Sequence, residues 1–561
     1  MKTDGAGPPA TPDARAADDV VPELLERARL WLNEDPDADT RAELEALLTR
    51  PEGPALAELQ DRFSGLLTFG TAGLRGALAA GPNRMNRAVV IRTSAALATF
   101  LNRHAGRTAV VGYDARHKSD VFARDTAAVL AGAGIRTLLL PRPLPTPVLA
   151  FAVRHLGLDA GVMVTASHNP RQDNGYKVYL APGSQLNSPA DAEITHLMGE
   201  VGPLASVPKK ESWRVLGEEV VEAYLKRVAA LPSPDSPRDL AIAYTPLHGV
   251  GRDVLLAALK RAGFAAPQVV AAQGDPDPDF PTVAFPNPEE PGAMDLALQL
   301  AAEQGSDIVL AHDPDADRCA VACGGRVLRG DEVGALLAIH LLRRDPLREG
   351  TFATSIVSSM LLARIAQAHD VPYAETLTGF KWIARVDGLR FGYEEALGYC
   401  VDPDAVLDKD GIAAALLVAE LAASLKADGR TLLDLLDEIA REYGVHATDQ
   451  LTVRCADPAD LQTLMRGLRS APPSTLGGRS VQSAEDLSRG LGGLPATDAL
   501  RYRMQGGARV IVRPSGTEPK LKVYLEVVVP VQDGDVSSAR RAGRVELEEL
   551  KRDVSRAVGL T

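Results

Sequence analysis

The feature that most constrains the fold is an alternation of short apolar runs with segments of helical periodicity. Strand-like runs occupy 108–113, 137–140, 162–164, 240–244 and 307–311, and helical segments separate most neighbouring runs. This spacing is typical of βαβ units, in which helices join parallel strands of one sheet. At 561 residues the chain is long enough for three to five domains. The sequence therefore predicts an α/β fold with several domains.

Composition and charge restrict the possible partners. The net charge is −13 at pH 7, which disfavours nucleic acid and anionic membrane surfaces as partners. No apolar run approaches the ~20 residues of a membrane span, and the N-terminus lacks a signal-peptide pattern. We therefore expect a cytoplasmic protein that binds neither nucleic acid nor membrane. Residues 1–19 have almost no large apolar side chains, so we expect a disordered tail there.

A polar loop at 165–170 follows the apolar run 161–164 and carries a candidate nucleophile, Ser167. In open α/β sheets, ligands bind beyond the carboxyl ends of the strands, which is where this loop is expected. A serine hydroxyl reacts only when a base, a metal or a preformed anion site activates it. His168 adjoins Ser167, and Lys177 lies in the next strand-like segment. From local sequence, Lys177 is either a catalytic group or an ordinary solvated lysine.

A second polar loop, at 312–318, follows the run 307–311 and carries Asp313, Asp315 and Asp317. Three carboxylates at alternate positions supply the hard oxygen ligands that Mg²⁺ prefers. The alternative is a solvated acidic turn. Residues 275–279 have the same aspartate spacing but lie among prolines without a strongly apolar strand before them, so they are predicted to form a connecting loop.

Two further loops have the composition of anion sites. Residues 513–520 place Arg513 beside Ser515, Gly516 and Thr517, which offer a guanidinium fork, hydroxyl donors and unhindered N–H groups to a phosphate. The glycine-punctuated stretch 66–76 carries one arginine, Arg75, and is either an anion loop or an ordinary turn.

Adjacent glutamates, Glu394 and Glu395, stand between apolar residues and glycines. Such carboxylates could hydrogen-bond sugar hydroxyls, although a helix start rich in acidic residues is an equally good interpretation. The chain thus offers a candidate nucleophile, a cation loop, sugar-binding carboxylates and a phosphate loop, each in a separate segment.

These motifs resemble the four active-site loops of the α-D-phosphohexomutase superfamily. The matching stretches are 165–170, 313–318, 392–399 and 513–524, in the same order across nearly the whole chain after the tail. In addition, 69–76, 378–383 and the long last motif are similar to the phosphoglucomutase, phosphomannomutase and phosphopentomutase branch.

The resemblance implies four domains around a central cleft: three related α/β domains and a smaller C-terminal α+β domain that can rotate. In this sequence the domains are expected at 20–210, 211–324, 325–444 and 445–561, with the phosphoserine, metal, sugar-binding and phosphate loops respectively. The same resemblance implies that the active enzyme carries Ser167 as phosphoserine. Mg²⁺ would then bind the three aspartates together with an oxygen of that phosphate.

The resemblance also implies roles for other residues. Arg75, His168 and Lys177 match positions near the phosphoserine, with Lys177 a candidate general acid or base. The implied substrate contacts are Arg318, Gly379, Lys381, Glu394, Glu395, Arg513, Ser515, Gly516 and Thr517. The chain departs from several family members at Phe380, Ala396 and Tyr399. These departures leave the second acid or base open.

The implied reaction interconverts hexose 1-phosphate and hexose 6-phosphate, of glucose or mannose, through a sugar bisphosphate that also acts as an activator. Pentose phosphates are the alternative substrates. The motifs are also compatible with a metal-dependent sugar phosphatase or a noncatalytic phosphosugar-binding protein. We expect a small phosphosugar as the partner, and a monomer or a homodimer.

Overall fold

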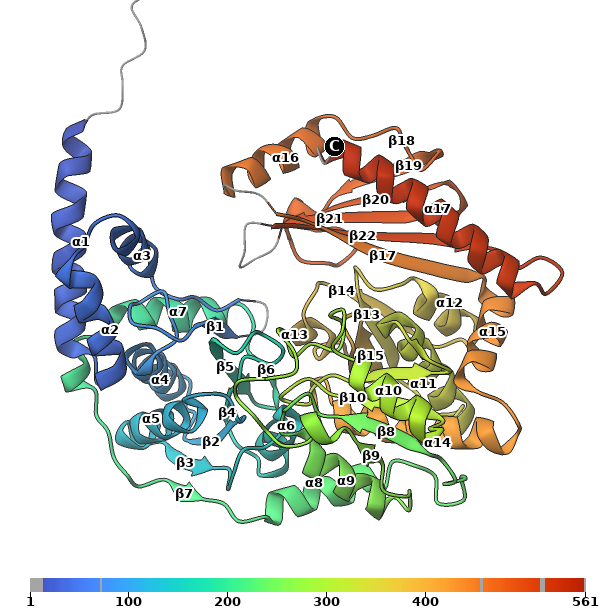
Figure 1. The fold of residues 1–561 in the computed structure, drawn as a ribbon, viewed down its shortest axis with the longest axis horizontal. Helices are drawn as coiled ribbons and strands as arrows, with labels where there is room; N and C mark the ends of the chain where they lie inside the picture. Colours follow the sequence, from blue (N-terminus) through green and yellow to red (C-terminus); the bar gives the residue numbers. More distant parts are fainter. Residues whose placement is uncertain (1–13, 71–72, 455–457, 515–519, 559–561) are drawn as a thin grey trace, which may run out of the picture.

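The structure is a computed structural model that describes residues 14–70, 73–454, 458–514 and 520–558. It contains four β-sheets, and each sheet with its helices is called a domain here, numbered 1 to 4 in chain order (Figure 1). No helix among these residues is both long enough and apolar enough to span a lipid bilayer.

Three N-terminal helices precede the first sheet. They are α1 (Ala14–Glu34), α2 (Ala38–Thr49) and α3 (Pro54–Arg62), and they pack together through Leu24, Leu44 and Leu59. The prediction of a disordered tail over residues 1–19 was wrong from Ala14 onwards, because the alanine-rich start of α1 has high helix propensity. Residues 1–13 lie outside the described residues.

Domain 1 contains a mixed sheet in the order β1-β5-β4-β2-β3-β7, with β6 paired to β5. The last strand of this sheet, β7, pairs in parallel with β3. It lies beyond residue 210, the position at which the sequence had predicted the end of domain 1. This two-residue exposed strand lacks the apolar pattern that would reveal it. The elements are β1 (Leu74–Ala77), α4 (Arg87–Arg103), β2 (Thr108–Tyr113), α5 (Ser119–Gly132), β3 (Arg136–Leu139), α6 (Thr146–His155), β4 (Ala160–Val164), β5 (Asp173–Leu180), β6 (Ser184–Gln185), α7 (Ala190–Glu200) and β7 (Arg214–Val215).

Domain 2 has the strand order β12-β11-β10-β8-β9. Its strands β8, β9 and β10 are parallel, so the carboxyl ends of these strands meet at one edge of the sheet. The elements are α8 (Glu219–Ala229), β8 (Ile242–Thr245), α9 (Gly251–Arg261), β9 (Gln268–Val269), α10 (Asp295–Gln304), β10 (Ile308–Ala311), β11 (Ala320–Cys323) and β12 (Arg326–Val327).

Domain 3 has the order β14-β13-β15-β16, with β16 antiparallel to β15. An apolar cluster continues through domains 1, 2 and 3, joining for example Leu149, Leu255 and Leu416. The shared core holds the first three domains together. The elements are α11 (Gly330–Arg344), β13 (Thr351–Ser355), α12 (Leu361–Ala368), β14 (Tyr373–Thr376), α13 (Phe380–Ile383), β15 (Leu389–Glu394), β16 (Gly398–Cys400), α14 (Gly411–Ala427) and α15 (Leu432–Tyr443).

Domain 4 contains an antiparallel sheet in the order β17-β22-β21-β20-β19-β18, together with the helices α16 and α17. In Figure 1 it lies beside domain 3 and apart from the N-terminal helices. The predicted fold class, three α/β domains followed by a smaller α+β domain, is confirmed. The elements are β17 (Val445–Arg454), α16 (Pro458–Ser470), β18 (Thr475–Leu476), β19 (Arg479–Asp486), β20 (Leu500–Met504), β21 (Arg509–Pro514), β22 (Lys520–Val529) and α17 (Val536–Ala557).

A buried ionic network joins domain 4 to domain 3. Glu526 on β22 accepts hydrogen bonds from the Ser359 hydroxyl (2.6 Å) and the Met360 N–H (3.0 Å) of domain 3. It also pairs with Arg509 at 2.9 Å, and Arg509 donates to the carbonyl oxygen of Ile356 at 3.0 Å. Because each charge has several partners, the network offsets the cost of burying Glu526 and Arg509.

This network predicts how stability depends on pH. Burial by itself raises the pKa of Glu526, but Arg509 and hydrogen bonds from His446 and Ser359 lower it to about 2. A folded-state pKa below the ~4.3 of free glutamate means that ionised Glu526 stabilises the fold above about pH 5, by about 3 kcal/mol, and that this contribution disappears as the pH falls towards 2. Thermal unfolding should therefore show Glu526→Gln to be less stable than wild type at pH 7, and equally stable near pH 2.

The control for this experiment is Glu549→Gln, which removes an exposed carboxylate from α17 of the same domain. We expect this variant to follow the wild type at every pH. A stability deficit of Glu526→Gln that stays constant down to pH 2 would contradict the role of the ionised carboxylate.

Candidate active site

Side chains that follow β2 and β4 fix the conformation of the loop carrying Ser167 by hydrogen bonds. Thr165 directly follows β4, and its hydroxyl donates to Asp114, after β2, at 2.6 Å and accepts the Ser167 N–H at 2.9 Å. Arg116 donates to the Ser167 carbonyl oxygen at 2.7 Å. These bonds hold Ser167 in the left-handed region, at φ 53°, which a non-glycine residue adopts only when its surroundings determine it.

The Ser167 hydroxyl lies between domains 1 and 2. It donates to Asp313 Oδ2 at 2.6 Å and is 3.1 Å from His168 Nδ1. Burial, with Arg318 and Arg75 nearby, lowers the pKa of His168 well below its usual value, so its ring is neutral at pH 7. The predicted nucleophile therefore contacts both a carboxylate of the predicted metal loop and a neutral imidazole.

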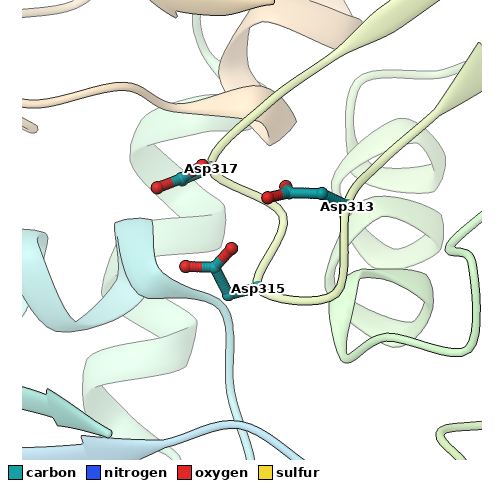
Figure 2. A group of neighbouring side chains, drawn as sticks. All are labelled: Asp313, Asp315 and Asp317. Atoms are coloured by element: carbon teal, nitrogen blue, oxygen red, sulfur yellow. The ribbon is translucent and has the colours of Figure 1, made fainter. Parts of the chain in front are cut away.

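Asp313, Asp315 and Asp317 lie on the loop that joins β10 to β11 (Figure 2). All three are buried, and one oxygen from each lies within 4.8 Å of the others. Asp315 Oδ1 and Asp317 Oδ1 are buried without any hydrogen-bond partner. Because a buried carboxylate oxygen without a partner is costly, this arrangement fits a hard divalent cation.

Two lysines balance part of the charge of this cluster. Lys177 Nζ on β5 lies 2.6 Å from Asp315 Oδ2 and 2.8 Å from Asp317 Oδ2. Lys409 Nζ lies 3.4 Å from Asp317 Oδ2. Burial opposes the ammonium form of Lys177, but the two aspartates outweigh it and raise its pKa. Burial and the neighbouring carboxylates raise the pKa of Asp313, whereas the two lysines outweigh burial and lower that of Asp317.

Lys409 was missed by the sequence analysis. It belongs to the run Asp408-Lys409-Asp410 immediately before the buried helix α14, and its ammonium lies 5.4 Å from the ring centroid of Phe380. An alternation of charges at the start of an otherwise apolar helix is the local signal that could have revealed it.

Arg75 and Arg318 contact the serine loop and the aspartate loop respectively. Arg75 on β1 donates to Asn169 Oδ1 at 3.1 Å, and its Nε is buried without a partner. Arg318 Nη1 lies 3.5 Å from Oε2 of Glu289, whose side chain is exposed. Arg318 also forms a backbone bridge with Gly398, which brings the metal loop against the loop that carries the predicted sugar-binding glutamates.

The two glutamates do not start a helix: Glu394 ends β15 and Glu395 begins the following turn. The Glu395 carboxylate accepts hydrogen bonds from Ser355 at 3.1 Å and Ser358 at 3.0 Å. Burial raises the pKa of Glu394, although Lys409 and Arg318 oppose it. The hydroxyl group of Tyr399 is buried and donates a hydrogen bond to the carbonyl oxygen of Gly330 at 3.3 Å.

The remaining predicted substrate contacts are less completely described. Gly379 precedes α13 at φ 107°, a conformation that favours glycine. The ammonium nitrogen of Lys381, on α13, lies 3.6 Å from Oδ2 of Asp191 in domain 1. Arg513 is half-buried near the end of β21. Ser515, Gly516 and Thr517 lie outside the described residues, so their predicted roles stay predictions.

Four sequence profiles of the phosphoglucomutase/phosphomannomutase family match this chain. Three describe alpha/beta/alpha domains I, II and III, and the fourth describes the C-terminal domain. The matched residues are 66–202, 222–326, 329–443 and 451–534. The fold and the four matches define the class of protein as a multidomain phosphosugar mutase.

Individual relatives and a solved structure agree with this class. A probable phosphomannomutase of Haemophilus influenzae is 46% identical over 79% of this chain and 93% of its own length. A phosphopentomutase of Mus musculus is 34% identical over 93% of this chain and 92% of its own. The crystal structure of a putative phosphomannomutase from Thermus thermophilus superimposes with a TM-score of 0.70 at 26% identity, covering 88% of this chain and 99% of that one. The chain belongs to the phosphoglucomutase/phosphomannomutase family, and it is an isomerase of that family, which is metal-dependent.

Proposed function

We propose that this enzyme interconverts hexose 1-phosphate and hexose 6-phosphate, with glucose or mannose as the sugar, and that Ser167 carries the transferred phosphoryl group. The observation that carries the proposal is the contact between the Ser167 hydroxyl and Asp313 within a buried triad of aspartates. The identity of 46% to a probable phosphomannomutase supports a hexose as the substrate.

The residues around Ser167 have distinct tasks in this proposal. Asp313, Asp315 and Asp317 would hold Mg²⁺, and the two unpartnered oxygens support this assignment. Bound Mg²⁺ supplies positive charge that stabilises the transferring phosphoryl group. Lys177 is held beside the triad as an ammonium group by Asp315 and Asp317, which suits it to donate a proton to a leaving oxygen; the neutral amine that results can then take a proton from an attacking hydroxyl.

The opposite side of the site would bind the rest of the substrate. Glu394 and Glu395 would accept hydrogen bonds from sugar hydroxyls, and Arg513 with the loop that follows it would hold the phosphate that is not reacting. Binding of that remote phosphate positions the acceptor hydroxyl. Phosphoserine gives its phosphoryl group to the sugar hydroxyl, and the resulting bisphosphate turns and returns its other phosphoryl group to Ser167.

A pentose phosphate is the second candidate substrate. It is favoured by the 34% identity to a phosphopentomutase over 92% of that protein's length. A pentose phosphate would use the same phosphate loop and fewer contacts from the glutamates.

The first experiment is a coupled mutase assay with Mg²⁺ and a trace of the matching sugar bisphosphate. It compares glucose 1-phosphate, mannose 1-phosphate and ribose 1-phosphate as substrates. We expect turnover of a hexose phosphate, stimulated by the bisphosphate. A clear preference for ribose 1-phosphate would establish the pentose alternative. Net phosphate release without isomerisation would indicate a phosphatase, and no turnover by protein phosphorylated on Ser167 would indicate a binding protein.

A further inference from the structure

The loop that carries the three aspartates of domain 2 is held from domain 1 by the start of helix α6. Thr146 is the first residue of α6 and is completely buried. Its backbone N–H donates to the carbonyl oxygen of Asp315 at 2.9 Å, and its hydroxyl donates to Asp315 Oδ2 at 2.5 Å. The two residues are 169 positions apart, so this double contact joins two separate domains.

The local sequence explains why the start of α6 can make this contact. The first N–H groups of a helix have no acceptor within the helix, so the buried N–H of Thr146 needs a partner from elsewhere. Pro145 is the N-cap and provides no capping hydrogen bond from its side chain. Threonine is branched at Cβ, which restricts the rotation of its side chain and therefore the direction of its hydroxyl. The first turn of α6 thus presents two donors in fixed directions to the metal loop.

This contact distinguishes the two oxygens of the Asp315 carboxylate, which lies beside the other two aspartates (Figure 2). Oδ2 accepts hydrogen bonds from the Thr146 hydroxyl and from Lys177 Nζ, the latter at 2.6 Å. Oδ1 is buried and has no hydrogen-bond partner among the residues that the structure describes. Two donors on one oxygen fix the plane of the carboxylate, and the other oxygen stays available to a cation.

We propose that Thr146 is a positioning residue of the metal site, and that its hydroxyl orients the Asp315 carboxylate for Mg²⁺. The inference rests on the proposed assignment of Mg²⁺ to the three aspartates. Groups that hydrogen-bond a metal ligand fix its orientation, and loss of one such group typically lowers metal affinity by about 10- to 100-fold. Thr146 acts through Asp315 and takes no part in the transfer of the phosphoryl group.

The test is the variant Thr146→Val, which keeps the branched shape of the side chain and the backbone N–H but removes the hydroxyl. Isothermal titration of the unphosphorylated protein with Mg²⁺, after removal of metal with EDTA, measures affinity without turnover. We expect the Kd for Mg²⁺ to rise by about 10- to 100-fold. In the coupled mutase assay, the Mg²⁺ concentration for half-maximal turnover should rise by the same factor. At saturating Mg²⁺, kcat should change less than about threefold, because only binding of the metal is weakened.

Three further variants complete this experiment. Thr146→Ser restores a hydroxyl at the same position and should recover most of the Mg²⁺ affinity. Thr137→Val removes another buried threonine hydroxyl of domain 1, which donates to the carbonyl oxygen of Ile135, and should bind Mg²⁺ as the wild type does. Thr146→Ala replaces Thr146→Val if thermal unfolding shows that the latter does not fold.

The outcomes separate this inference from the proposed function. Wild-type Mg²⁺ affinity in Thr146→Val, or equal weakening in Thr146→Val and Thr146→Ser, would overturn the inference and leave the proposed function intact. Weaker Mg²⁺ binding that Thr146→Ser restores, in an enzyme that isomerises none of the three sugar phosphates, would support the inference and overturn the proposed function. If the wild-type protein binds no Mg²⁺, the assignment of the metal to the aspartates and the inference are both overturned.

Discussion

Replacing Ser167 with alanine should reduce mutase turnover by at least about 10⁴-fold, because the oxygen that accepts and returns the phosphoryl group is lost. The fold should survive, since the Ser167 backbone keeps its bonds from Arg116 and to Thr165. The coupled assay measures the turnover. Mass spectrometry of the protein after incubation with the sugar bisphosphate should show a phosphoryl group on the wild type and none on the variant.

A matched control for this variant is Ser206→Ala, which removes an exposed hydroxyl from the same domain. It should retain full turnover and should be phosphorylated to the same extent as wild type. Appreciable residual mutase activity in Ser167→Ala, with a normal unfolding transition, would disprove the assignment of the nucleophile.

Replacing Asp313 with asparagine should reduce turnover by about 10³-fold, because a metal site contributes several kcal/mol of charge stabilisation in the transition state. The substitution keeps the shape of the side chain and removes one negative charge from a buried triad. Mg²⁺ affinity should fall together with turnover. Isothermal titration with Mg²⁺ and a Mg²⁺ titration of activity after chelation with EDTA measure the two effects.

The chain supplies a control for this experiment in its other acidic loop. Asp275→Asn changes an exposed aspartate in the run 275–279, which has the spacing of the metal loop and lies outside helices and strands, as predicted. It should leave both Mg²⁺ affinity and turnover unchanged. Equal Mg²⁺ affinity in Asp313→Asn and wild type would remove Asp313 from the metal site.

Local sequence was sufficient to predict the elements that present the site. Ser167 and Asp313 each follow a short apolar run, and in both places the structure has a buried strand that ends just before the polar loop. The N-cap of α4 is Asn86, a residue type that favours this position. These features depend on residues within a few positions of one another, so a pattern along the chain is enough to reveal them.

Contacts between distant segments could not be predicted in this way. Ser167 and Asp313 are 146 positions apart, and Lys177 and Asp315 are 138 apart, so no periodic pattern links them. Lys409 lies in a segment that the motifs do not single out as a basic site. Tyr399, which replaces a possible acid or base, proved to donate its hydroxyl to a core carbonyl group.

The sequence by itself therefore determined the fold class, the order of the polar loops and their resemblance to a mutase family, because these properties arise from short-range patterns. Only the tertiary structure decided which charged groups meet. It placed Lys177 and Lys409 beside the aspartates and left two carboxylate oxygens without hydrogen-bond partners. The reason is physical: the free energy of a buried charge depends on the partners that the packing of separate domains brings to it.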